Sequence, residues 1–127
     1  MPVNRREVGI GLGAAAMLAA AAPGALAATD SYRMYVGSYT VPKGKAAGIV
    51  CLSLDRSTGQ MSRLSETPGV NPSWLAVSQD RRFLYASNEI SDFQTALSGS
   101  ATAYAIAPDG QLQELNRQAS GGVSPAA

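Results

Sequence analysis

Short apolar runs separated by polar, glycine-containing turns make up the chain from Ser31 onward. No stretch there keeps the period of an α-helix, and runs rich in Val, Ile, Tyr and Leu recur instead about every ten residues. We predict seven strands, at residues 32–39, 48–54, 60–65, 73–78, 83–88, 101–107 and 111–116. The predicted fold class is therefore all-β.

Two of the polar connections have the composition of β-hairpin turns. They read "LDRSTGQM" and "IAPDGQL", and each places a glycine, Gly59 or Gly110, at the end of the turn. Glycine is favoured there because it adopts a positive φ without the steric penalty of a side chain. We therefore expect paired strands on either side of both turns.

The same two turns reveal a repeat in the sequence. The segment at 52–64 aligns with the one at 104–115 with an offset of 51 residues, which matches Gly59 with Gly110. "YVGSYT" lies over "YASNEI" with an offset of 50 residues, and "VNPSW" lies over "VSPAA" with an offset of 53 residues. A repeat of about 50 residues with four strands is typical of a β-propeller blade.

The repeat also predicts how the chain divides into blades. Residues 70–118 supply the four strands of a second blade, whereas residues 32–65 supply only three strands of the first, and residues 119–127 would begin a third. Because several blades are needed to close a ring, fewer than two blades predict the N-terminal part of a longer protein or a truncated product. The expected partners are the missing propeller blades, or further copies associating through open strand edges.

The N-terminal segment, residues 1–27, has the three-part pattern of an export signal. A positive start precedes a weakly apolar run, and small residues at Ala25 and Ala27 mark a cleavage site. The adjacent Arg5 and Arg6 resemble the twin-arginine signal of bacteria, and a general secretory signal is the alternative. Since the apolar run is shorter than the roughly 20 residues that span a bilayer, no membrane span is expected after cleavage. The mature protein would be periplasmic or extracellular.

The charge balance of the mature chain limits its partners. Residues 28–31 are expected to form a short linker to a partial propeller domain at 32–127. Without residues 1–27, eight basic and eight acidic residues remain, so the formal net charge is zero. A neutral domain gives no electrostatic reason to expect nucleic acid or an anionic membrane as a partner.

Cys51 is the only cysteine of the chain, so no intramolecular disulfide is possible. It lies in the apolar run "GIVCLSLD", where a small buried side chain is the favoured interpretation. A reactive nucleophile is the less favoured one, because the chain contains no histidine that could lower the pKa of the thiol.

Four segments carry a resemblance to a known family. "YVGSYT", "GIVCLSLDRSTGQM", "NPSWLAVSQDRRFLYASNE" and "AYAIAPDGQLQELNRQASGGVSP" occur in this order between residues 32 and 125. The set resembles the seven-bladed β-propeller lactonases, the 6-phosphogluconolactonase-like family, of which it covers about the first quarter. The resemblance implies hydrolysis of a sugar lactone such as 6-phosphogluconolactone. Neither it nor the residues indicate a cofactor or a metal.

Lactone hydrolysis needs a base for the water, donors for the developing oxyanion and groups that hold the sugar hydroxyls. In a propeller, the first and second strands of a blade lie nearest the central channel. Polar residues end those strands here: Glu89 is the predicted water-activating base or hydroxyl acceptor, and Asn71 and Asn88 are predicted hydrogen-bond donors to the lactone. Tyr39, which lies where Glu89 lies in the repeat, is a further predicted substrate-binding residue.

Each of these residues also has a structural interpretation. Asn71 before a proline is a common turn start, and the pair at 88–89 can form a solvated loop. Trp74 fits a blade-packing position better than a sugar-stacking platform. The arginines at 81–82 fit a solvated hairpin turn better than a phosphate site.

The sequence departs from the family pattern at its last residue. Lactonases of this family tend to carry a histidine shortly after an "SGG-x-x-P" segment, and here Ala127 aligns with it. A complete catalytic group is therefore not expected within this chain. Two functional classes stay open: part of an exported lactonase, which would be inactive alone, or a non-catalytic propeller segment that binds a ligand or a protein.

Overall fold

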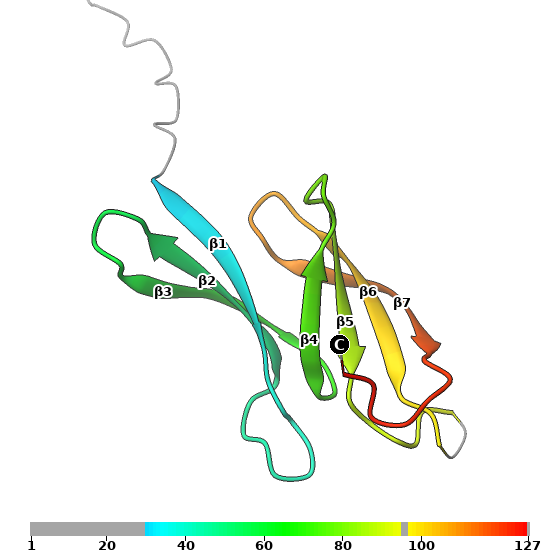
Figure 1. Ribbon diagram of the computed structural model, residues 1–127. Coiled ribbons are helices and arrows are strands. Elements are labelled where there is room, and N and C mark those ends of the chain that lie inside the picture. Colours follow the sequence, from blue (N-terminus) through cyan, green and yellow to red (C-terminus); the bar gives the residue numbers. More distant parts are fainter. Residues whose placement is uncertain (1–29, 95–96, 127) are drawn as a thin grey trace, which may run out of the picture.

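Seven strands in two antiparallel sheets form the protein, as the computed structural model shows for residues 30–94 and 97–126 (Figure 1). The strands are β1 (Ser31–Gly37), β2 (Gly48–Asp55), β3 (Met61–Pro68), β4 (Pro72–Val77), β5 (Phe83–Asn88), β6 (Ser100–Ile106) and β7 (Leu112–Ala119). The first sheet has the order β1-β2-β3 and the second β4-β5-β6-β7. The predicted all-β fold with fewer than two complete blades is confirmed. The predicted export signal at 1–27 lies outside the described residues.

Several strand ends differ from the predicted bounds. β1 ends at Gly37 instead of residue 39, because the chain leaves the sheet at Ser38. β3 extends to Pro68 because Gly48 and Ile49 of β2 continue the ladder opposite it. β7 likewise extends to Ala119, which pairs with Ser100. Each addition is three residues at a strand end, where side-chain pattern carries little information.

The predicted hairpin turns are present. Gly59 and Gly110 have φ angles of 72° and 90°, as the turn composition requires. In the first turn, the Asp55 carboxylate accepts hydrogen bonds from the Ser57 hydroxyl and from the backbone N–H groups of Ser57 and Thr58. These bonds, the Ser57 hydroxyl first, lower the pKa of Asp55 to about 2. The turn therefore keeps its acceptor charged at any physiological pH.

A small core lies between the two sheets. Ile49 of β2 packs with Leu84, Ala86 and Tyr104 of the second sheet, and all four are fully buried. Partly buried side chains surround this cluster: Tyr35, Leu75, Ile106 and Leu112. The sheets approach each other where β1 lies beside β4, so one face of each blade is covered by the other (Figure 1). The predicted buried position of Cys51 is confirmed, since 2% of it is exposed.

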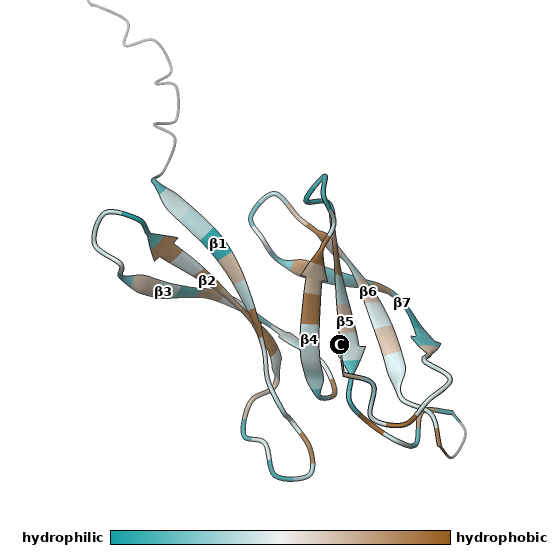
Figure 2. Ribbon diagram, in the orientation of Figure 1, coloured by the Kyte–Doolittle hydropathy of each residue, from teal (hydrophilic) through white to brown (hydrophobic). Residues whose placement is uncertain are grey.

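The outer faces of both sheets carry exposed apolar side chains. Figure 2 shows hydrophobic residues along β4, whereas the tip of the β4–β5 hairpin is polar. Trp74 and Tyr85, on neighbouring strands of the second sheet, are 56% and 47% exposed. Met34 and Val36 are exposed on β1 of the first sheet. In this chain, Trp74 therefore covers no blade core, although its position on the sheet face suits blade packing.

The segment after β7 repeats the one that joins the two blades. Asn71 and Ser124, which align in the sequence repeat, both have positive φ angles, of 41° and 45°. The Ser124 N–H donates to the Ile90 carbonyl, and the Ser87 hydroxyl donates to the Pro125 carbonyl. Residues 120–126 thus lie against the end of β5 as residues 69–72 lie against the end of β1. That residues 119–127 begin a third blade stays a prediction.

We expect residues 28–127 alone to associate through their open faces and edges. Three uncovered apolar side chains cost on the order of 5 to 9 kcal/mol, at roughly 1.5 to 3 kcal/mol each, which is comparable to the stability of a domain. Sedimentation should show mixed oligomers, and hydrogen exchange should show little protection. Replacing both Trp74 and Tyr85 with lysine should reduce the association, because charged side chains oppose the pairing of sheet edges and faces between copies. A protected, monodisperse monomer would show that missing blades are not required.

Candidate functional site

Two predicted site residues meet directly at the ends of equivalent strands. The Tyr39 hydroxyl donates a hydrogen bond to Oε2 of Glu89, with an oxygen–oxygen distance of 2.6 Å. Tyr39 follows β1 and Glu89 follows β5, which are the same strand in successive blades. The hydrogen bond to Glu89, followed by desolvation and the Glu89 charge, raises the pKa of Tyr39 above its ordinary value. The phenol is therefore protonated at neutral pH.

Asn71 fixes this pair by joining the two loops that carry it. Its side-chain Oδ1 accepts hydrogen bonds from the backbone N–H groups of Thr40 and Val41, at 2.8 and 2.9 Å. Its Nδ2 donates to the Glu89 carbonyl, and its own carbonyl accepts from the Glu89 N–H. Asn71 is 6% exposed and adopts a positive φ, which asparagine tolerates better than most residues. Both backbone groups of Glu89 are thus held by one residue.

Asn88 is the buried end of a polar chain that crosses the second sheet to the exposed Glu114. Its Nδ2 donates to the Val70 carbonyl at 2.8 Å, and its Oδ1 accepts from the Thr102 hydroxyl at 2.6 Å. The Thr102 oxygen accepts in turn from Nε of Arg117, whose Nη2 contacts the Glu114 carboxylate. Hydrogen-bonded chains of this kind fix side-chain positions because each buried member would be costly to leave unpaired. They hold the end of β5, next to Glu89, in one place.

The structure brings all four predicted site residues into one region, but they differ in access. Tyr39 is 54% exposed, whereas Asn88 is fully buried and Asn71 nearly so. Glu89 is partly exposed. The accessible groups are therefore a carboxylate, which can accept a proton, and a phenol, which can donate one. In this structure both asparagine side chains contact protein atoms, and their predicted contact with a lactone stays a prediction.

Sequence reasoning missed three residues of this region. Thr40 accepts the Asn71 N–H with its hydroxyl and donates to Asn71 with its own N–H. Thr102 and Arg117 support Asn88 from the neighbouring strands. The only available signal was the alternation of side chains between the two faces of the sheet, which places Thr102 on the same face as Asn88. No sequence pattern specifies that this threonine bonds to an amide instead of packing against an apolar neighbour.

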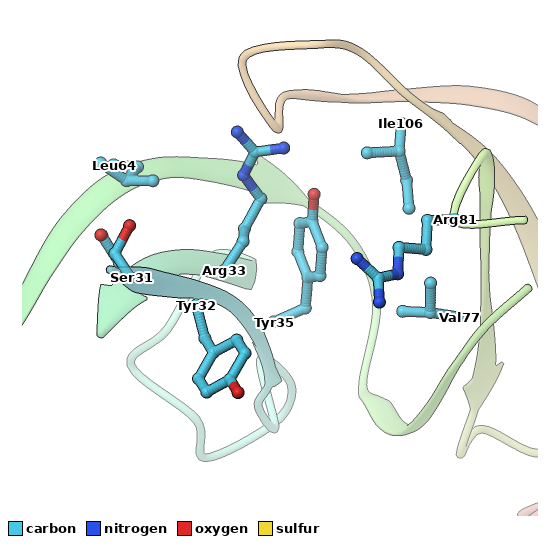
Figure 3. A pocket seen from close by; sticks show the side chains of 9 residues that line it. Ser31, Tyr32, Arg33, Tyr35, Leu64, Val77, Arg81 and Ile106 are labelled. Carbon is cyan, nitrogen blue, oxygen red and sulfur yellow. The ribbon is translucent and has the colours of Figure 1, made fainter. Parts of the chain in front are cut away.

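A cavity lies elsewhere, between the two sheets (Figure 3). It has a volume of about 550 Å³, and none of the four predicted site residues lines it. Arg33 and Arg81 lie on its two sides, with Tyr35 between them. Arg33 donates to the Pro108 carbonyl, and the Tyr35 hydroxyl donates to the Gly110 carbonyl. These bonds tie β1 to the β6–β7 turn. The polar residues of the cavity therefore have a structural role in joining the two sheets.

Residues 30–94 and 97–126 contain no cluster of three histidine, cysteine or carboxylate side chains placed to hold a metal ion. The same ranges include no helix with the length and apolar character needed to cross a membrane.

Comparison with known proteins gives a consistent result. The sequence profile of the seven-bladed β-propeller lactonases matches residues 33–127. Among solved structures, a predicted 6-phosphogluconolactonase from Bacteroides fragilis is 34% identical, with a TM-score of 0.68. A predicted 6-phosphogluconolactonase from Bacteroides uniformis is 31% identical, with a TM-score of 0.67. The periplasmic gluconolactonase of Pseudomonas aeruginosa is 29% identical, with a TM-score of 0.66.

The matched region is a small part of these relatives. The alignments cover 76%, 76% and 75% of this chain, but only 26% of each solved structure. The chain therefore spans about a quarter of their length. No match was found among curated proteins.

We predict that Asn71→Ala destabilises a complete propeller containing this chain by about 2 to 4 kcal/mol. The substitution leaves the Thr40 and Val41 N–H groups without their acceptor. A fully buried unpaired group costs about 1 to 3 kcal/mol, and these two part-buried groups together cost less than twice the upper value because water reaches them in part. Chemical denaturation, followed by fluorescence, measures the change.

Two further variants separate the contributions at this position. Asn71→Gly loses the same bonds but relieves the positive φ, so it should be less destabilising than alanine. Asn116→Ala, at an exposed asparagine of β7, should change the stability by no more than about 0.5 kcal/mol. Equal stability of wild type and Asn71→Ala would contradict the assigned role.

Proposed function

Since the chain belongs to the family of seven-bladed β-propeller lactonases, we propose that it forms part of an enzyme that hydrolyses a sugar lactone. The observation that carries this proposal is the contact between Tyr39 and Glu89 at the ends of equivalent strands. A fixed, accessible carboxylate is the group that ester hydrolysis needs to activate water. Further blades, outside the quarter of the relatives' length that this chain spans, would supply the other side of the site.

Glu89 is the proposed general base. Its backbone is held by Asn71 at both N–H and C=O, so the carboxylate has a defined position from which to accept a proton from water. In general-base catalysis, that transfer accompanies attack of the water oxygen on the lactone carbonyl. Alternatively, the same carboxylate would accept a hydrogen bond from a sugar hydroxyl. Tyr39 lies beside it as a substrate-binding group.

Asn71 and Asn88 are proposed to act on the same site in two ways. Their bonds to Glu89 and Val70 position the loop that carries the base. Each Nδ2 also has a second hydrogen, which is the atom that a direct donor role toward the lactone would use. Stabilisation of the oxyanion that forms at the carbonyl would come from such donors and from the missing blades.

The proposed substrate is a lactone of the gluconolactone type. This follows from the relatives, two of which are described as 6-phosphogluconolactonases and one as a gluconolactonase. The sugar hydroxyls of such a lactone suit a site rich in carboxylate, phenol and amide groups. Comparing turnover of the phosphorylated and the unphosphorylated lactone would decide which of the two is the substrate.

The protein is further proposed to be exported. Residues 1–27 have the pattern of an export signal, and the relative from Pseudomonas aeruginosa is described as periplasmic. The lactone would then be hydrolysed outside the cytoplasm.

For the base, we expect Glu89→Gln to lower lactone turnover by about 10²-fold or more in a complete propeller containing this chain. The amide cannot accept the proton of water, and removing a general base commonly costs this much. The matched control is Glu66→Gln, which removes a carboxylate paired with Arg63 on β3. Turnover should be unchanged in the control. Unchanged turnover in a folded Glu89→Gln protein would assign Glu89 to the solvated loop, whereas absence of lactone turnover in the wild type would favour a non-catalytic binding propeller.

For export, we expect the mature protein to begin at Ala28. Replacing Arg5 and Arg6 with lysine should retain the precursor in the cytoplasm, because the twin-arginine route requires both arginines. Cell fractionation and N-terminal sequencing measure both results. Export that is insensitive to the arginine pair would indicate a general secretory signal, and an uncleaved protein in the cytoplasm would contradict export.

A further inference from the structure

The hydrogen bond between Tyr39 and Glu89 joins the proposed base to a second titratable group. The phenol oxygen lies 2.6 Å from Oε2 of Glu89 and more than half of Tyr39 is exposed, so a substrate bound at Glu89 can also reach the phenol. Hydrolysis of a lactone needs a proton acceptor and, later, a proton donor.

We propose that Tyr39 is a catalytic proton donor to the ring oxygen that leaves when the lactone opens, and that Glu89 restores its proton. This inference rests on the proposed lactone hydrolysis. It goes further by giving Tyr39 a part in the chemistry, where the sequence suggested only substrate binding. It also explains why the two residues are in contact at equivalent strand ends.

The proposed steps balance in atoms and charge. Glu89 takes a proton from water while the water oxygen forms a bond to the lactone carbonyl carbon. The resulting oxyanion collapses, and the bond between the carbonyl carbon and the ring oxygen breaks. Tyr39 gives its proton to that oxygen as it leaves, and the Glu89 carboxylic acid returns a proton to the phenolate. The products are the hydroxy acid and an enzyme in its starting protonation state.

The surroundings of Tyr39 suit this role. Its hydroxyl donates a hydrogen bond to the Glu89 carboxylate, and that bond, together with desolvation and the negative charge of Glu89, raises the pKa of Tyr39. When Glu89 gains the proton of water, that opposing charge disappears, so release of the phenol proton becomes easier at the step that needs it. Asn71 holds the Tyr39 loop and the Glu89 loop together through Thr40 and Val41, which keeps the donor and the base at a fixed separation.

The test compares two kinds of lactone with Tyr39→Phe in a complete propeller containing this chain. When gluconolactone opens, its leaving group is a sugar alkoxide, a strong base that needs a proton. When dihydrocoumarin opens, its leaving group is a phenolate, a much weaker base. Tyr39→Phe should lower turnover of gluconolactone by about 10²-fold and that of dihydrocoumarin by much less. Glu89→Gln should lower both. The control Tyr32→Phe, at a tyrosine with the same 54% exposure on β1, should change neither.

Other outcomes would overturn the proposal in distinguishable ways. An equal loss on both lactones would make Tyr39 a positioning residue, and no loss on either would remove it from the reaction. If wild type hydrolyses no lactone, the proposed function fails together with the proton transfer. A readout independent of activity is the NMR titration of Tyr39, whose pKa should fall toward about 10 in Glu89→Gln. An unchanged titration would show that the phenol does not bond to this carboxylate.

Discussion

The side chain of Asn71 is the interaction on which the arrangement of the site depends. It bonds to the loop after β1 with its oxygen and to Glu89 after β5 with its nitrogen. These loops follow strands of different sheets, and neither loop is part of a β-ladder that would fix its position. Because an amide can accept and donate at once, one asparagine at a positive φ satisfies several backbone groups that would otherwise be buried without partners.

The rest of the fold follows from repetition of a blade that is incomplete by itself. Each sheet buries one face against its neighbour, and the core around Leu84 and Tyr104 exists only because two sheets are present. The link after β7 repeats the link after β3, with Ser124 in the place of Asn71. Serine has no amide with which to hold both loops, so the Asn71 junction is the more extensively bonded of the two. The polar site thus lies where the blade contact is best defined.

The sequence allowed the strands, both hairpin glycines and the repeat to be predicted, because alternation and turn composition are local properties. The repeat also aligned Tyr39 with Glu89, and equivalent strand ends in adjacent blades are indeed neighbours. The direction of the Asn71 amide was not predictable, since residue spacing does not specify which backbone groups need partners. The exposure of Trp74 likewise depends on which faces are covered, which is a tertiary property.

We propose that lactone chemistry takes place at the contact of Tyr39 and Glu89. The most direct measurement is a crystal structure of a complete propeller containing this chain, with the hydroxy acid product bound. We expect the product carboxylate beside a water held by Glu89, and the released hydroxyl within hydrogen-bond distance of the Tyr39 oxygen. Product bound away from both residues, for example in the cavity beside Arg33 and Arg81, would contradict it.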